Sequence, residues 1–135
     1  MIRVKDVVRV KMPYPNINSE LAASAHMYIC KKSGTEKDFL KIQTKKNKHR
    51  IHGIPIDNYF ELEGNSNDNP CKRDSFVDLE KNFNLKGVKI PIWLKTDRDL
   101  KQAIYNDIIN RENILEFVPI NTNNFLNLNY ACSRY

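Results

Sequence analysis

The sequence predicts a small, mainly β protein, in which a strongly bent antiparallel sheet or barrel of five or six short strands precedes one helix. Hydrophobic residues alternate with polar ones through much of the first 95 residues, as in strands with one buried face. Hydrophobic residues recur at helical spacing only after residue 95. The 135 residues, 41% of them hydrophobic, suffice for one domain with its own core.

The first three predicted strands lie within residues 7–12, 25–30 and 38–44. The turn KKSGTEK joins the second and third into a hairpin, because Gly34 can adopt a positive φ. The loop PYPNINSELAAS separates the first two strands. It is longer than most connections, and long loops are often functional.

Later apolar runs predict the remaining elements. IPIDNYFELE, RDSFVDLEKN and GVKIPIWL are each typical of a short strand, and Pro91 favours an edge or a bend for the last of them. In TDRDLKQAIYNDIINREN, apolar residues fall at helical spacing, namely Leu100, Ala103, Ile104 and Ile108. We expect Thr96 to cap this amphipathic helix, with Asp99 three residues later.

Positive charge is concentrated in the predicted sheet. Residues 1–95 carry a formal charge of +7, whereas residues 96–135 carry −1. The stretch KIQTKKNKHR, Lys41–Arg50, contains five Lys or Arg in ten residues. This distribution favours a polyanionic partner, and a merely soluble basic surface is the alternative.

Other features exclude several classes of protein. Cys30, Cys71 and Cys132 form no CxxC or Cys/His spacing, which predicts free thiols in a reducing cytoplasm, without zinc or disulfides. Charges throughout MIRVKDVVRVK exclude a secretory leader. The longest uncharged run, FVPINTNNFLNLNYACS, is too rich in Asn to span a membrane. The Asn-rich residues 117–135 suit a last strand, a partner-binding segment or an unstructured tail.

Four stretches, in order, resemble the PemK/MazF family of toxin endoribonucleases. KDVVRVKMPYPN is similar to the family's first strand and Pro-containing loop, HMYIC to its second strand, and FLKIQT to its third, which typically ends in Thr. CKRDSFVDLEKNFNLKGVKI matches best, with a basic residue, Asp and Ser before an apolar-x-Leu-Glu pattern.

The resemblance implies an SH3-like small barrel of about five to seven short strands with a C-terminal helix, spanning residues 1–116 and forming a homodimer. Members of the family cleave single-stranded RNA, including mRNA, at short sequences without a metal or other cofactor. They leave a cyclic phosphate and a 5′-hydroxyl. A small antitoxin protein silences each toxin and binds DNA together with it. We therefore expect the toxin of a type II toxin–antitoxin pair.

Cleavage of RNA without a metal needs a base, an acid and stabilising cations. Thr44 matches the strand-end Thr of the family, although it also suits a structural strand end. His26 is a candidate base or acid because imidazole titrates near neutrality, and a histidine bonded to backbone is the alternative. Lys46 would share a strand face with Thr44 and supply a cation, or else be a solvated lysine.

One departure from the family concerns catalysis. Its Arg-Pro pair before the second strand is replaced by Ser24-Ala25. Either His26 assumes part of the role of that Arg, or a lysine or arginine elsewhere does, or the chain binds RNA and cuts it poorly. The residues we expect to contact RNA, by phosphate contact or base stacking, are Ser24, Lys45, Lys48, Arg50, Arg73 and Tyr14.

Weaker predictions concern the remaining aromatic and histidine residues. Tyr28 and Tyr59 are further possible stacking platforms, although core roles suit them better. His49 and His52 are expected on the surface of the basic turn.

Two other functions stay open. A non-catalytic SH3-like module that binds nucleic acid or protein is favoured by the missing Arg. A poison of a protein target such as DNA gyrase belongs to the same structural superfamily, and only the tail ending in NLNYACSRY favours it.

Overall fold

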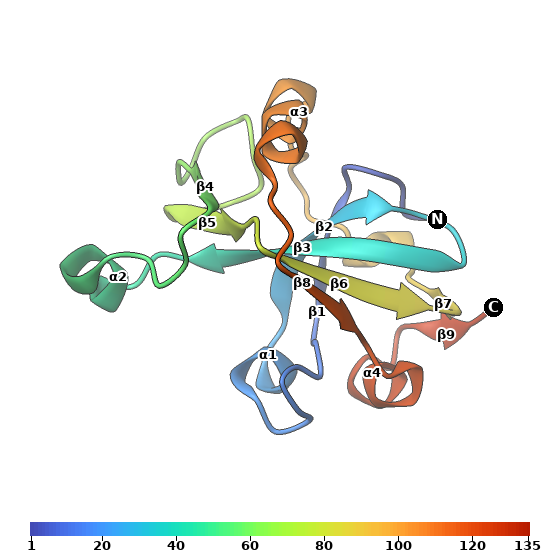
Figure 1. The fold of residues 1–135 in the computed structure, drawn as a ribbon. Coiled ribbons are helices and arrows are strands. Elements are labelled where there is room, and N and C mark those ends of the chain that lie inside the picture. The colour runs from blue at the N-terminus through green and yellow to red at the C-terminus, as the bar shows by residue number, and fades with distance from the viewer.

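The computed structural model describes residues 1–135 as a seven-stranded sheet, a two-stranded ribbon and four α-helices (Figure 1). The strands are β1 (Val7–Val10), β2 (His26–Lys32), β3 (Glu36–Thr44), β4 (Tyr59–Leu62), β5 (Ser75–Asp78), β6 (Lys81–Lys86), β7 (Val88–Lys89), β8 (Glu116–Pro119) and β9 (Ser133–Arg134). The helices are α1 (Glu20–Ala23), α2 (Asn47–His52), α3 (Gln102–Arg111) and α4 (Thr122–Leu128), with a 3₁₀ turn η1 (Ile92–Leu94). None of them has the length and apolar content needed to cross a membrane.

The long strand β3 organises the sheet. One edge pairs with β2, and the other pairs first with β6, at Phe39↔Phe83, and then with β5, at Thr44↔Ser75. Because β3 changes partner along its length, the sheet bends there. The antiparallel neighbours β1 and β4 lie at the two ends of the main path, and β8 runs parallel to β6. A mainly β protein with a bent antiparallel sheet is confirmed, and the strand pairing does not close into a barrel.

Two sequence predictions for strands were wrong in detail. RDSFVDLEKN is divided between β5 and β6, with a bend at which the Glu80 N–H donates to Asp78 Oδ1 at 2.8 Å. GVKIPIWL holds only the two-residue strand β7 before the chain turns through η1. Pro91, which lacks a backbone donor, lies immediately before that turn.

The predicted amphipathic helix exists, but it begins later than expected. α3 starts at Gln102, so Thr96 does not cap it. Instead the Thr96 hydroxyl donates to the carbonyl of Arg98 at 2.9 Å, and its N–H donates to the carbonyl of Val7. Of the predicted apolar face, Ile108 is buried and Ala103 is exposed.

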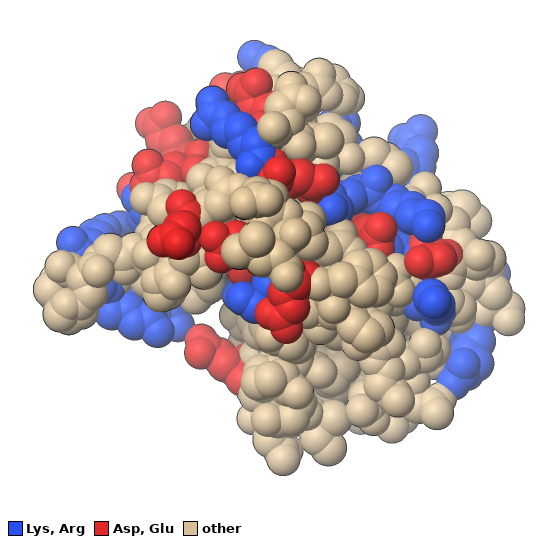
Figure 2. Space-filling view, in the orientation of Figure 1, with Lys and Arg blue, Asp and Glu red and all other residues tan.

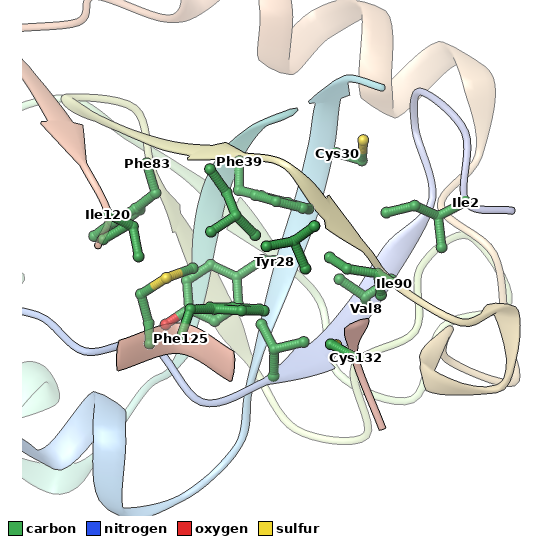
Figure 3. Close-up of a cluster of buried hydrophobic side chains, with 14 of the residues drawn as sticks. Ile2, Val8, Tyr28, Cys30, Phe39, Phe83, Ile90, Ile120, Phe125 and Cys132 are labelled. Carbon is green, nitrogen blue, oxygen red and sulfur yellow. The ribbon is translucent and has the colours of Figure 1, made fainter. Parts of the chain in front are cut away.

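The sheet separates two hydrophobic cores. Ten buried residues lie on the face covered by α3, and they include Ile42 and Ile108. Fifteen lie on the opposite face, where Phe125 of α4 packs among them (Figure 3). In this larger core, Tyr28 packs edge to face on Phe83, with ring centroids 5.8 Å apart. The architecture is therefore three layers: α3, sheet and α4.

Residues 117–135, whose structure the sequence left open, are part of this domain. Four of them belong to the larger core: Val118, Ile120, Phe125 and Cys132. β9 pairs with β7, which brings Tyr135 beside the fully buried Lys37. The ammonium of Lys37 donates to the carbonyls of Gly34 and Val88 and to the Tyr135 hydroxyl, so all three of its protons are used.

Candidate nucleic-acid interface

A basic cleft of about 830 Å³ opens where β3 ends and β5 begins. None of its lining residues is hydrophobic: Thr44, Lys45, Lys46, Asn47, Arg50, Gly64, Lys72, Arg73 and Asp74. Five of these residues are cations and one is an anion. Figure 2 shows Lys and Arg side chains along the projection that ends in α2, at the left of the view. We call this cavity the basic cleft.

The cleft forms because the β3–β5 ladder ends and its two chains diverge. Its last strand pair is Thr44↔Ser75, and the Lys45 N–H then donates to the carbonyl of Asp74 at 2.9 Å. Beyond this bond, one chain turns into α2 and the other belongs to the loop of residues 63–74. These two segments are the walls of the cleft, and Thr44 lies where they meet.

The first wall is the short helix α2. Lys46 is its N-cap residue, and the Lys46 N–H donates to His49 Nδ1 at 2.9 Å. The His49 ring is buried against Phe76, with the ring centroids 5.3 Å apart. Burial lowers the pKa of His49, and the neighbouring lysines lower it further. The prediction that His49 lies on the surface was wrong, because this ring anchors the helix.

The second wall is held by backbone contacts at Gly64. Its N–H donates to Asp74 Oδ1 at 2.8 Å. A Cβ at this glycine would lie 2.4 Å from the carbonyl carbon of Arg73, so no larger residue fits without a backbone shift. Buried Asn69 fixes the rest of the loop by donating to the carbonyl of Glu63 and accepting from the Cys71 N–H.

Only some of the cations in the cleft are neutralised. Lys45 is paired with Glu61, and the Lys46 ammonium lies 3.0 Å from a carboxylate oxygen of Glu20. No carboxylate pairs with the other three cations, which are Arg50, Lys72 and Arg73. The cleft therefore has unneutralised guanidinium and ammonium groups on both walls, which suits a ligand carrying more than one phosphate.

Five of the nine predicted site residues line this cleft: Thr44, Lys45, Lys46, Arg50 and Arg73. Sequence reasoning missed Asn47, Gly64, Lys72 and Asp74. Two of these, Lys72 and Asp74, lie within the quoted stretch CKRDS, so that stretch held a signal for the second wall. The prediction that Lys46 continues β3 beside Thr44 was wrong, since β3 ends at Thr44.

The structure does not bring His26 to Thr44. In the β2–β3 register Met27 lies opposite Ile42, so His26 and Thr44 point to opposite faces of the sheet. His26 Nδ1 lies 2.9 Å from the carbonyl oxygen of Ser24, and neither residue lines the cleft. Of the two histidines expected on the surface, His52 is exposed.

The other predicted contacts lie outside the cleft. Tyr14 packs edge to face on Phe83, at 5.3 Å between ring centroids, and its hydroxyl donates to Glu116. Tyr28 is fully buried, which excludes it as a stacking platform. Tyr59 is 38% exposed and packs on Phe76. Lys48 is exposed on α2, next to the first wall.

The residues of the cleft suit phosphate binding and proton transfer to a carboxylate. The Thr44 hydroxyl is free of intramolecular hydrogen bonds and can donate to a phosphate oxygen. Asp74 is the one carboxylate on the cleft wall, and Gly64 uses only its Oδ1. No group of three His, Cys, Asp or Glu side chains gathers as metal ligands would. Comparisons of the chain with known protein families, curated proteins and solved structures find no match.

Proposed function

We propose that the protein binds single-stranded RNA in the basic cleft and cleaves it, as the toxin of a type II toxin–antitoxin pair. The observation that carries this proposal is the lining of the cleft: five cations, three of them without a carboxylate partner, and no hydrophobic residue. Cations of this kind bind the phosphates that every RNA carries. A drug-sized apolar ligand would need hydrophobic walls, which the cleft lacks.

The proposed reaction is an internal displacement at phosphorus. The 2′-oxygen of a ribose attacks the adjacent phosphorus while its proton passes to a base, and the bond from phosphorus to the 5′-oxygen breaks. The products are a 2′,3′-cyclic phosphate and a 5′-hydroxyl. Asp74 is the base in this proposal, an ammonium group of Lys45 or Lys46 protonates the leaving oxygen, and Thr44 donates to the phosphate.

In this proposal Arg50 and Arg73 replace the arginine that precedes the second strand in the PemK/MazF family. They stand on opposite walls of the cleft, and neither is engaged by a carboxylate. Guanidinium groups stabilise the charge that grows on a phosphoryl group in the transition state. His26 has no role in this scheme, because its strand face is opposite to that of Thr44.

The proposal includes a relationship between the fold of this chain and the SH3-like fold of the PemK/MazF family. The order of strands around β3 and the late helix α3 are its support. The homodimer and the antitoxin partner follow only from the resemblance, whereas the cytoplasmic location also rests on the absence of paired cysteine spacing. All three belong to the same proposal.

A second candidate is a module that binds RNA without cutting it. The observation that favours it is the composition of the cleft, in which no histidine stands beside Thr44. Binding would then use the same cations, whereas cleavage would be absent from the wild-type protein.

Induction of the chain alone in a bacterial host, with mapping of transcript ends, separates these functions. The toxin proposal predicts growth arrest and discrete cuts at one recurring short sequence, both lost in Arg73→Gln. The charge-matched control Lys86→Gln, on β6 outside the cleft, should behave as wild type. Arrest with intact transcripts would indicate a poison of a protein target, and no arrest would favour the binding module.

A further inference from the structure

A second cavity, of about 320 Å³, adjoins the basic cleft. The two share Lys72 as a lining residue. Arg9 from β1 and Trp93 from η1 also line the second cavity, and its one carboxylate is Asp97. We call it the tryptophan cavity. Because Lys72 borders both spaces, a chain-like ligand can leave the cleft past this residue and enter the tryptophan cavity.

Trp93 is 74% exposed, which is unusual for so large an apolar side chain. The backbone around it is fixed. Lys95 forms a β-bridge with Val8, and the Thr96 N–H donates to the carbonyl of Val7 at 2.8 Å. Leu94, next to Trp93, packs against the larger core. These contacts fix the turn, and Trp93 is therefore a preformed aromatic surface that faces solvent.

The charges around Trp93 decide which ligand suits it. Lys95 is neutralised by Asp6 and Asp99, and the Arg98 guanidinium donates to the carbonyl of Ser66. Arg9 and Lys72 have no carboxylate partner. An exposed aromatic face beside unpaired cations is the combination that binds single-stranded nucleic acid, through stacked bases and backbone phosphates.

We propose that the tryptophan cavity is a base-stacking subsite for single-stranded RNA whose phosphates occupy the basic cleft. The strand passes Lys72, one of its bases stacks on Trp93, and Arg9 contacts a phosphate. This inference rests on the proposed RNA binding and extends it by a second subsite. It also predicts the kind of RNA preferred, since only an unpaired base can stack on the indole.

Trp93 is the one tryptophan of the chain, so tryptophan fluorescence reports on this side chain alone. We would titrate the protein with oligoribonucleotides of about 4 and about 12 nucleotides, the range that single-strand sites cover. The longer strand should quench Trp93. A duplex of the same length should leave the fluorescence almost unchanged, because its bases are already stacked.

Variants test the contribution of stacking to affinity, measured by anisotropy of labelled RNA. Trp93→Ala should weaken binding of the longer strand by roughly 5- to 100-fold, the effect of losing one stacked base. Trp93→Phe should retain most of the affinity. The neighbouring Ile92→Ala truncates another apolar side chain of the same turn, 51% exposed, and should leave the affinity unchanged.

Three results would overturn the inference in different ways. If RNA binds and needs Arg73 but Trp93 is neither quenched nor required, the subsite is wrong and the proposed function stands. If a duplex quenches Trp93 as strongly as a single strand, base stacking is wrong. If no RNA binds, both proposals fall, and the exposed indole belongs to a surface for a protein partner.

Discussion

Thr44 is the residue at which the two walls of the basic cleft meet, and its hydroxyl is free to bind a ligand. Thr44→Val removes this hydroxyl and keeps the shape of the side chain. If the hydroxyl donates to the phosphate in the transition state, the cleavage rate should fall roughly 100-fold, with RNA affinity changed much less. Thr44→Ser should keep most of the rate. Equal rates for Thr44→Val and wild type in a single-turnover assay would remove Thr44 from the mechanism.

His49 makes the first wall sensitive to pH. Its neutral Nδ1 accepts the Lys46 N–H, and burial followed by neighbouring lysines lowers its pKa. The unfolded chain therefore binds a proton at a higher pH than the folded protein does. The free energy of unfolding should be highest above about pH 6.5, the ordinary imidazole value, and fall as the pH drops toward the folded pKa.

His49→Gln isolates this effect in urea unfolding measured at about pH 7.5 and about pH 5.5. Glutamine at this helical position also accepts the N-cap N–H, but it does not titrate. The wild type should lose more stability on acidification than the variant. An equal loss in both proteins would contradict the assignment, because the half-buried His26 and the exposed His52 are present in each.

At the scale of elements, the loop of residues 63–74 shapes the cleft through Gly64. A Cβ there would lie 2.5 Å from the backbone nitrogen of Asp74. Gly64→Ala should therefore cost about 1–3 kcal/mol of the free energy of unfolding, the range for a forced backbone shift, and should weaken RNA binding as well. Asn67→Ala, at an exposed position of the same loop, is the matched control and should stay within about 0.5 kcal/mol. A Gly64→Ala protein as stable as the control would refute the tight contact.

Local sequence patterns predicted the strands better than the short helices. β1, β2 and β3 fall where residues alternate, because each has at least one strongly apolar face. α2 was missed because KKNKHR has no apolar period, and the helix depends on the His49 cap and its packing on Phe76. These are tertiary contacts, which a local pattern does not contain.

At the scale of the whole molecule, the last 19 residues complete the larger core. Phe125, a residue of α4, is fully buried in it (Figure 3). Phe125→Ala should cost about 3–5 kcal/mol of the free energy of unfolding, through lost burial and the remaining cavity. The exposed Phe117 offers a control, since Phe117→Ala should cost far less. Similar denaturation midpoints for the two variants would show that the C-terminal segment does not contribute to the core as the structure shows it.

The candidate site could be predicted only in part, because it depends on contacts between segments that are distant in the sequence. Thr44, Arg50 and Arg73 were found because they lie in basic stretches and in the stretches that resemble the PemK/MazF family. His26 and Thr44 were expected in one catalytic site, but the sheet places them on opposite faces. Their relative placement depends on strand register, and a shift of one residue reverses the face. The second wall depends on the contact of Gly64 with Arg73, which lies nine residues further along the chain.

The most direct test of the central claim is the salt dependence of single-stranded RNA binding. The logarithm of the association constant should fall linearly with the logarithm of salt concentration, and each phosphate contact contributes about 0.7 to the slope. Arg50→Gln and Arg73→Gln should each lower the slope by about that amount, whereas Lys86→Gln, outside the cleft, should leave it unchanged. Equal slopes for all four proteins, or no binding by the wild type, would show that the basic cleft is not an RNA site.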